Sequence, residues 1–277
     1  MPELPEVELI SRSLHTIVNG RTIERAELLR ERLAPDIAPL DFFKKLRKSK
    51  INFVHRRGKN ILFDLSGEKT LIVHLRMSGR FSLLKAEAEN PKFTHAVFHL
   101  GDDERLVFDD QRHFGLMKIV ETGPLNEAKE LKKLAPEPFS DEFSIEYLTG
   151  AVKASKRTLK EFLLDQTKVC GLGNIYAAEA MFAAGLDPRK QTDKLSRASI
   201  LRLHESIRAV LQMAIQHAGN QKVDPENLEG SYFSAGTDAG WFVYDREKEP
   251  CRNCKTTIVT LKQGGRSTYY CPKCQRK

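Results

Sequence analysis

The chain has 277 residues, a formal net charge of +8 and a sequence pI near 9.2. This length supports a full hydrophobic core and predicts two lobes rather than one. The positive balance favours a polyanionic partner, and basic residues gather at 44–50, 56–59 and 153–160. No apolar run is long enough to span a membrane and no secretory signal is apparent, so we expect a cytoplasmic protein.

The opening sequence Met-Pro-Glu-Leu-Pro-Glu carries a candidate nucleophile. Removal of Met1 in front of the small residue Pro2 would leave a secondary amine at the chain end. An α-amino group has a pKa near ~8, so a useful fraction is neutral and can form an iminium ion with an aldehyde-level carbon. Glu3 and Glu6 supply carboxylates close to that carbon. The structural alternative is that Pro5 and the glutamates only begin a helix, whose N-terminus favours negative charge.

The residues up to about 133 predict a lobe made mostly of strands. Residues 5–19 have the apolar spacing of an amphipathic helix, whereas apolar residues between 22 and 120 alternate with a period of two. This pattern predicts a two-sheet β-sandwich with one helix that carries the N-terminus. The Pro-bearing segment 134–140 predicts a linker.

The sequence after the linker is helical. Apolar spacing predicts helices over 144–153, 158–165, 174–184 and 196–217. Glycines at 171 and 173 precede Asn174, so a tight turn presents the start of a helix, which is favourable for a phosphate. The alternative is that these glycines only allow close helix packing.

Four cysteines near the C-terminus have the spacing of a metal site. Cys251 and Cys254 form one pair, Cys271 and Cys274 form another, and sixteen residues separate the pairs. Two such pairs suit one tetrahedral zinc ion, and the residues between them predict strands over 256–261 and 267–270. We therefore expect one structural zinc ion on a β-hairpin rather than two disulfides. The fifth cysteine, Cys170, is expected to be a packed thiol.

The opening motif, the Gly-Asn-Ile-Tyr sequence at 173–176 and the four-cysteine hairpin carrying Arg266 occur in one chain. Together they resemble the bacterial formamidopyrimidine-DNA glycosylase (MutM) family over essentially the whole length. The resemblance implies an α+β fold, with a β-sandwich lobe over 1–133, a helix-two-turn-helix DNA-binding domain over 141–238 and a zinc-bound hairpin over 239–277.

The same resemblance implies a bifunctional DNA glycosylase and abasic-site lyase. Such an enzyme extrudes an oxidised purine from duplex DNA, excises it and cleaves the backbone by β,δ-elimination. Pro2 would be the nucleophile and Glu3 the general acid and base. Lys59 and Arg266 would bind phosphate and act in β- and δ-elimination, respectively. Glu6 would support the terminus.

Three residues are implied to fill the gap that an extruded base leaves in the duplex. Met77 adapts its shape, Phe114 wedges into a base step, and Arg112 can hydrogen-bond the orphaned base. Without the resemblance, Met77 and Phe114 would be predicted as core residues. The other implied DNA contacts are His74, His95, Lys156, Asn174 and Tyr244, and a core position is the alternative for the two histidines.

One segment departs from the family pattern. Within 218–238 the chain keeps one glycine of the usual pair and adds aromatic residues. This leaves open an enzyme like endonuclease VIII that acts on oxidised pyrimidines, or mainly a lyase at abasic sites. A non-enzymatic DNA-binding protein is a third hypothesis, although mere binding does not need a nucleophilic terminus. We expect a monomer that binds damaged double-stranded DNA in the bacterial nucleoid.

Overall fold

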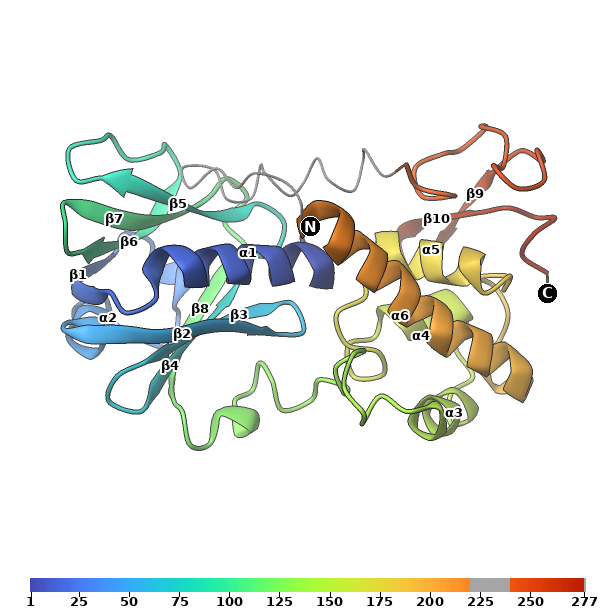
Figure 1. Cartoon of the computed structure of the whole chain (residues 1–277), viewed down its shortest axis with the longest axis horizontal. Coiled ribbons are helices and arrows are strands. Elements are labelled where there is room, and N and C mark those ends of the chain that lie inside the picture. Colours follow the sequence, from blue (N-terminus) through green and yellow to red (C-terminus); the bar gives the residue numbers. More distant parts are fainter. Residues whose placement is uncertain (220–239, 277) are drawn as a thin grey trace. The chain divides into compact units, whose positions relative to one another are not determined.

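The computed structural model describes residues 1–219 and 240–276, which form two compact units (Figure 1). The first unit lies within Met1–Lys132, and the second combines Lys133–His217 with residues from 240 onward. The division falls beside the segment 134–140 that we predicted as a linker. None of the described helices is both long and apolar enough to cross a membrane.

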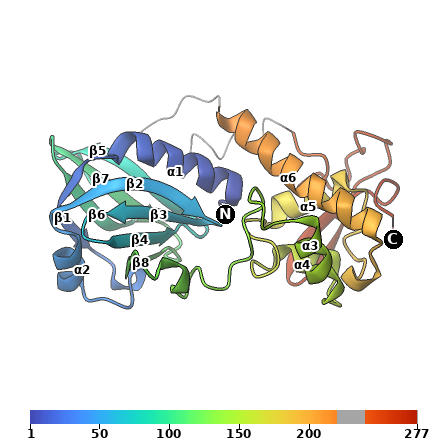
Figure 2. The same cartoon turned by 60° about the horizontal axis from the view of Figure 1, so that its bottom comes forward.

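The first unit is built from antiparallel strands, seen from two directions in Figures 1 and 2. They are β1 (Thr22–Leu28), β2 (Ser49–Arg57), β3 (Asn60–Leu65), β4 (Lys69–His74), β5 (Gly79–Lys85), β6 (Thr94–Leu100), β7 (Glu104–Asp110) and β8 (Leu116–Glu121). Their order is β5-β7-β6-β1-β2-β3-β4-β8. Only two residue pairs join β1 to β2, so the strands divide into two sheets that share this short edge.

The two sheets face each other across an apolar core. The ring of Phe81 on β5 lies 5.7 Å from that of Phe63 on β3 and 5.1 Å from that of Phe108 on β7. Apolar residues of both sheets also surround one small cavity, lined by Ile23, Ile51, Phe63, Leu65, Leu71, Phe98 and Leu106. This arrangement confirms the predicted two-sheet sandwich.

Helix α1 (Leu4–Val18) lies alongside β2 and carries the N-terminus (Figure 1). The Arg56 Nε atom of β2 donates to the Glu8 carboxylate at 2.6 Å, and the Val54 amide donates to the His15 ring at 3.2 Å. Ten of the fifteen residues of α1 are buried, among them every residue from Leu4 to Val7, so the start of the helix is covered on all sides. The apolar face that the spacing predicted is buried as well. The helix is therefore held both by apolar packing and by polar contacts at each end.

One helix in the first unit was missed. Helix α2 (Pro39–Leu46) occupies a segment for which we predicted alternating strands. It buries only Phe42 and Leu46, four residues apart, while Leu40 is 61 % exposed. An eight-residue helix with two buried side chains and an exposed leucine gives almost no helical periodicity, which explains the wrong prediction.

The second unit is helical with a terminal hairpin. Its elements are α3 (Ile145–Lys153), α4 (Leu159–Leu164), α5 (Asn174–Ala183), α6 (Arg197–Gly219), β9 (Val259–Gln263) and β10 (Arg266–Tyr270). Short 3₁₀ turns complete the described elements: η1 (Glu31–Leu33), η2 (Leu125–Glu127) and η3 (Thr192–Lys194). The four predicted helices are present to within two residues. The first hairpin strand runs over Val259–Gln263 rather than 256–261. It extends to Gln263 because the turn contains only Gly264 and Gly265, and it begins at Val259, which pairs with Tyr270 at the end of β10.

Candidate active site

The N-terminal residues are fixed by the start of α1. Glu3 is the N-cap and is only 2 % exposed, Pro2 is buried, and Met1 is exposed. The Glu3 carboxylate accepts a hydrogen bond from the Glu6 amide, and the Glu6 carboxylate accepts one from the Glu3 amide at 2.8 Å. These reciprocal bonds satisfy two helix-terminal amides and hold the residue after the predicted nucleophile in one place.

Lys59 and His74 lie together at one end of the sandwich. Lys59 is buried in the two-residue turn between β2 and β3, where Gly58 has a φ of +59°. The next residue, Asn60, pairs with His74 at the end of β4. Burial, with the charges of Arg76 and Lys59, lowers the pKa of His74 to about 3. Its Nδ1 atom accepts the Arg76 amide hydrogen at 3.0 Å, so the neutral ring carries its proton on Nε2.

Met77 and Phe114 are exposed rather than buried. They are 42 % and 46 % exposed, and the Arg112 guanidinium lies 5.5 Å from the centre of the Phe114 ring. Met77 lies between β4 and β5, and the other two lie between β7 and β8. The core position that their hydrophobicity alone would predict is thus excluded. We call Met77, Arg112 and Phe114 the wedge.

A buried carboxylate joins the two loops of the wedge. Asp110 accepts hydrogen bonds from the Ser78 hydroxyl, from the Arg112 amide at 3.2 Å and from the Gly115 amide at 2.6 Å. Burial opposes ionisation, but the hydrogen bonds outweigh it and hold the pKa of Asp110 below its usual range. Sequence reasoning did not identify this residue.

His95 occupies the core position that we gave as the alternative. It is 2 % exposed, and its Nε2 atom lies 2.8 Å from Nδ1 of His113 in the wedge loop. The two rings stack with centroids 5.0 Å apart. His95 therefore supports the wedge loop through His113, and its contact with DNA stays a prediction.

In the second unit, the hairpin presents Arg266 on a firmly held backbone. Gly264 and Gly265 both have positive φ, and the exposed Arg266 begins β10. Asn174, the first residue of α5, donates from Nδ2 to the Ser267 carbonyl at 3.1 Å. The backbone next to Arg266 is thus anchored, through the Ser267 carbonyl, to the start of α5.

A buried lysine holds the same carbonyl and was missed from the sequence. Lys160 on α4 is fully buried, and its Nζ atom donates to the Ser267 carbonyl and, at 2.7 Å, to the Thr268 hydroxyl. Burial and the charge of Arg266 lower the pKa of Lys160 to about 8. The residue that we did name, Lys156, is exposed between α3 and α4. A positively charged side chain in the first turn of a helix is disfavoured by the helix dipole. The position of Lys160 was therefore the sequence feature that could have indicated a specific partner for this lysine.

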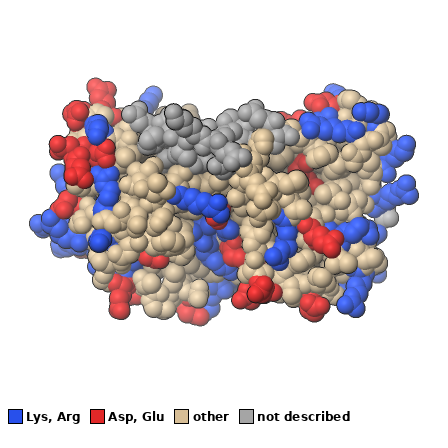
Figure 3. Space-filling model, viewed as in Figure 1, with Lys and Arg blue, Asp and Glu red and all other residues tan. Residues whose placement is uncertain are grey.

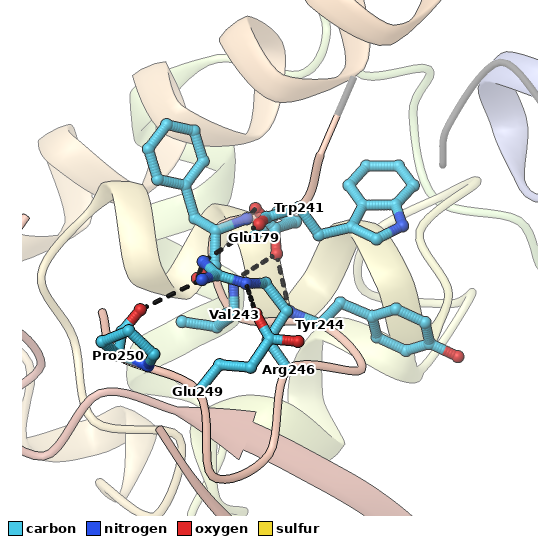
Figure 4. A network of polar contacts seen from close by, with 8 residues as sticks. Glu179, Trp241, Val243, Tyr244, Arg246, Glu249 and Pro250 are labelled. Atoms are coloured by element: carbon cyan, nitrogen blue, oxygen red, sulfur yellow. Dashed lines mark hydrogen bonds and ion pairs between the residues drawn. The ribbon is translucent and has the colours of Figure 1, made fainter. Parts of the chain in front are cut away.

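Tyr244 is positioned by a second buried group that sequence reasoning missed. The Glu179 carboxylate of α5 accepts the amide hydrogens of Phe242, Val243 and Tyr244 at 2.9, 3.0 and 2.9 Å (Figure 4). The Tyr244 ring lies edge-on to Tyr269 of β10. Helix α5 therefore fixes both the hairpin, through its first residue, and the turn before the cysteines, through Glu179.

The four predicted metal ligands lie together. Their Sγ atoms are all within 4.8 Å of one another, with 3.9 Å between Cys251 and Cys274 and 3.4 Å between Cys254 and Cys271. Thiolates lie roughly 3.8 Å apart when each is ~2.3 Å from a tetrahedral zinc ion, so the set fits zinc. The Thr256 hydroxyl lowers the pKa of Cys254 to about 6. Cys170 is buried elsewhere, near Glu137, as predicted.

Comparison with known proteins agrees with this geometry. Residues 1–117 match the formamidopyrimidine-DNA glycosylase N-terminal domain, 134–224 its H2TH domain, and 248–276 the zinc finger found in FPG and IleRS. The chain is 39 % identical to the formamidopyrimidine-DNA glycosylases of Carboxydothermus hydrogenoformans and Bacillus subtilis, with all of both chains covered in each case. The chain belongs to the formamidopyrimidine-DNA glycosylase family.

Solved structures of one family member are also similar. Lactococcus lactis Fpg bound to abasic-site DNA matches with a TM-score of 0.91 and 33 % identity, over 99 % of this chain and 100 % of that one. The same protein with DNA containing N7-benzyl-Fapy-dG gives a TM-score of 0.91, and with DNA containing an oxidised pyrimidine 0.90, each over the full length of both chains at 33 % identity. The zinc-finger match and the cysteine geometry assign one structural zinc ion to this chain. The departure that we noted within 218–238 falls almost wholly outside the described residues.

Removal of the zinc ion is expected to disrupt the metal module and leave the sandwich folded, because small modules of this kind owe their fold to the metal. Val243, Cys251 and Cys271 share one core, so the neighbouring Trp241, the single tryptophan, would change its emission. Chelation followed by tryptophan fluorescence and circular dichroism tests this. Unchanged emission from protein shown to lack zinc would contradict it, and Cys170→Ser should keep the metal.

His74 is expected to stay neutral from pH 5 to 8, because its pKa lies well below that range. Long-range ¹⁵N NMR should show one unchanging ring with its proton on Nε2, whereas a histidine in an unfolded peptide titrates near ~6.5. Arg76→Ala should raise the pKa of His74 only in part, since burial is the larger cause. A titration midpoint for the His74 ring between pH 6 and 7 would contradict the buried position of the ring beside Arg76 and Lys59.

Proposed function

We propose that this chain excises oxidised purines from double-stranded DNA and cleaves the backbone at the abasic site, with the Pro2 amine as nucleophile. The observation that carries the proposal is the buried start of α1, where the Glu3–Glu6 hydrogen bonds hold the terminus. Support comes from the family and from its member solved with abasic and Fapy-dG-containing DNA. The chain would act in the bacterial cytoplasm, on the nucleoid.

The chemistry follows from an amine at this position. After removal of Met1, the Pro2 nitrogen forms a bond to C1′ of the extruded nucleotide, and the bond from C1′ to the base breaks. Glu3 supplies protons for departure of the base and opening of the sugar ring, which gives an iminium ion. The iminium acidifies the C2′ hydrogen, so the C3′–O bond and then the C5′–O bond can break by elimination.

Other residues of the first unit support this reaction in the proposal. Lys59 binds the phosphate next to the lesion and donates a proton in β-elimination, while neutral His74 donates a hydrogen bond from Nε2. Glu6 acts through the helix cap and not on the substrate. The wedge fills the gap left by the extruded base.

The second unit contributes phosphate contacts in the proposal. Arg266 grips a phosphate and acts in δ-elimination, on a backbone that Asn174 and Lys160 hold through Ser267. Tyr244 and Lys156 add further phosphate contacts. We divide the unit functionally into a helix-two-turn-helix domain over 141–238 and a zinc hairpin over 239–277.

A second substrate class has one specific observation in its favour. The similar Lactococcus lactis protein has been solved with DNA that contains an oxidised pyrimidine. Oxidised pyrimidines are therefore the competing candidate, and direct comparison of lesions decides between them.

Duplexes with 8-oxoguanine opposite cytosine, thymine glycol opposite adenine and an abasic site test the proposal. We expect release of 8-oxoguanine and strand breaks with phosphate at both ends. Glu3→Gln keeps a cap acceptor but should lower the rate of base release by ~10²–10⁴-fold, the usual contribution of a general acid. Glu24→Gln, at an exposed position of β1, is the control and should be near wild type. Cleavage of the thymine glycol duplex alone would favour the pyrimidine enzyme, and no cleavage of any duplex would reject the function.

A further inference from the structure

The wedge loops are two of the connections that cross between the sheets. One joins β4 to β5 and the other joins β7 to β8, and the strand registers place both at the same end of the sandwich. Lys59 and His74 lie at this end on the sheet β2-β3-β4-β8, where α1 packs with Pro2 at its start. The proposed nucleophile therefore lies on one side of the wedge. The end of β1 and the start of β6 lie at this same end of the sandwich, but on the other sheet.

Three cations follow β1 or precede β6 on this second sheet. The Arg32 guanidinium lies 5.9 Å from the centre of the Phe114 ring, which Arg112 also approaches. Arg30 lies beside it on a loop that the His95 carbonyl holds by accepting its amide hydrogen. Lys92 lies 5.5 Å over the Phe93 ring, which contacts His113 in the wedge loop. We call Arg30, Arg32 and Lys92 the basic edge.

The side chains of the basic edge have no acidic partner at ion-pair distance among the described residues of the first unit. All three side chains are exposed, and none makes an ion pair with any residue in the described parts of the chain. At the other end of the same strands, Arg21 and Lys85 each lie 2.8 Å from Glu104, and Lys48 pairs with Glu24. The face seen in Figure 3 carries both signs of charge on either unit.

We propose that Arg30, Arg32 and Lys92 bind backbone phosphates of the undamaged strand. The inference rests on the proposed function, because Pro2 marks the side of the damaged strand and the wedge enters the duplex between the strands. Guanidinium groups match phosphate oxygens in charge and geometry. Arg32 also packs on Phe114, so one side chain would link the phosphate contact to the residue that wedges the duplex.

Salt-dependent binding to two DNA substrates tests the strand assignment. Anisotropy titrations would use a duplex with a tetrahydrofuran abasic analogue and the same damaged strand without its complement. The slope of log affinity against log salt should fall by ~0.9 for R32A and by up to three times that for the triple variant R30A/R32A/K92A on the duplex. Binding to the single strand should not change. R32K should retain the duplex slope, because it keeps the charge.

Arg47→Ala is the matched control. Arg47 is exposed, and its guanidinium lies 5.8 Å over the Phe43 ring, but it follows α2 at the other end of β1. We expect it to bind both substrates as wild type does. Equal losses on duplex and single strand for R32A would place the contact on the damaged strand and overturn the assignment. An unchanged salt slope for the triple variant on the duplex would show that these three residues do not bind phosphate.

Cleavage of an authentic abasic duplex by the wild-type chain separates the two proposals. If the wild type binds the duplex with the expected slopes but never cleaves it, the proposed reaction fails while the phosphate contacts stand. If the wild type cleaves the duplex and the triple variant keeps the full salt slope, the proposed phosphate contacts of the basic edge are wrong while the proposed reaction stands.

Discussion

The proposed role of the chain terminus as a nucleophile depends on the reciprocal hydrogen bonds between Glu3 and Glu6. A chain end ordinarily samples many conformations, and an amine spread over them gains little from proximity to a substrate. Here the first turn of α1 is buried, and two of its amides are satisfied by these two carboxylates. The helix start that we gave as the structural alternative is therefore present, and it is compatible with the proposed chemistry at Pro2. The residues that begin the helix also fix the position of Pro2.

Within each unit, buried charged groups also hold exposed candidate residues through the backbone. Asp110 holds the wedge loops, Lys160 holds the strand that follows Arg266, and Glu179 holds the turn that carries Tyr244. A buried charge is costly unless hydrogen bonds satisfy it, and each of these groups makes at least two. The hydrogen bonds of Asp110 hold the two loops in place, so Met77 and Phe114 stay exposed and do not pack into the core.

The elements that the sequence predicted correctly are those whose pattern lies within a short stretch of the chain. Regular apolar spacing defined α1, α3, α5 and α6, and the two close cysteine pairs defined the metal site. Helix α2 was missed because it buries too little to show a period. Lys160 and Glu179 were missed for a different reason, since Lys160 contacts Ser267, 107 residues away, and Glu179 contacts a turn more than 60 residues later. Burial of a charged side chain depends on such distant partners and has no local pattern. For Met77 and Phe114, hydrophobicity alone predicted buried positions, which is wrong. Only the resemblance predicted that they are exposed.

Borohydride trapping with mapping of the adduct tests the nucleophile most directly. The full-length chain would be incubated with an abasic duplex and with an 8-oxoguanine duplex, reduced, digested and examined by mass spectrometry. A chain that retains Met1, and so has no free Pro2 amine, is the control. We expect a stable protein–DNA adduct on both duplexes, attached to the Pro2 nitrogen and absent from the control. An adduct on Lys59 or another lysine, or no adduct on either duplex, would contradict the central role of the terminal amine.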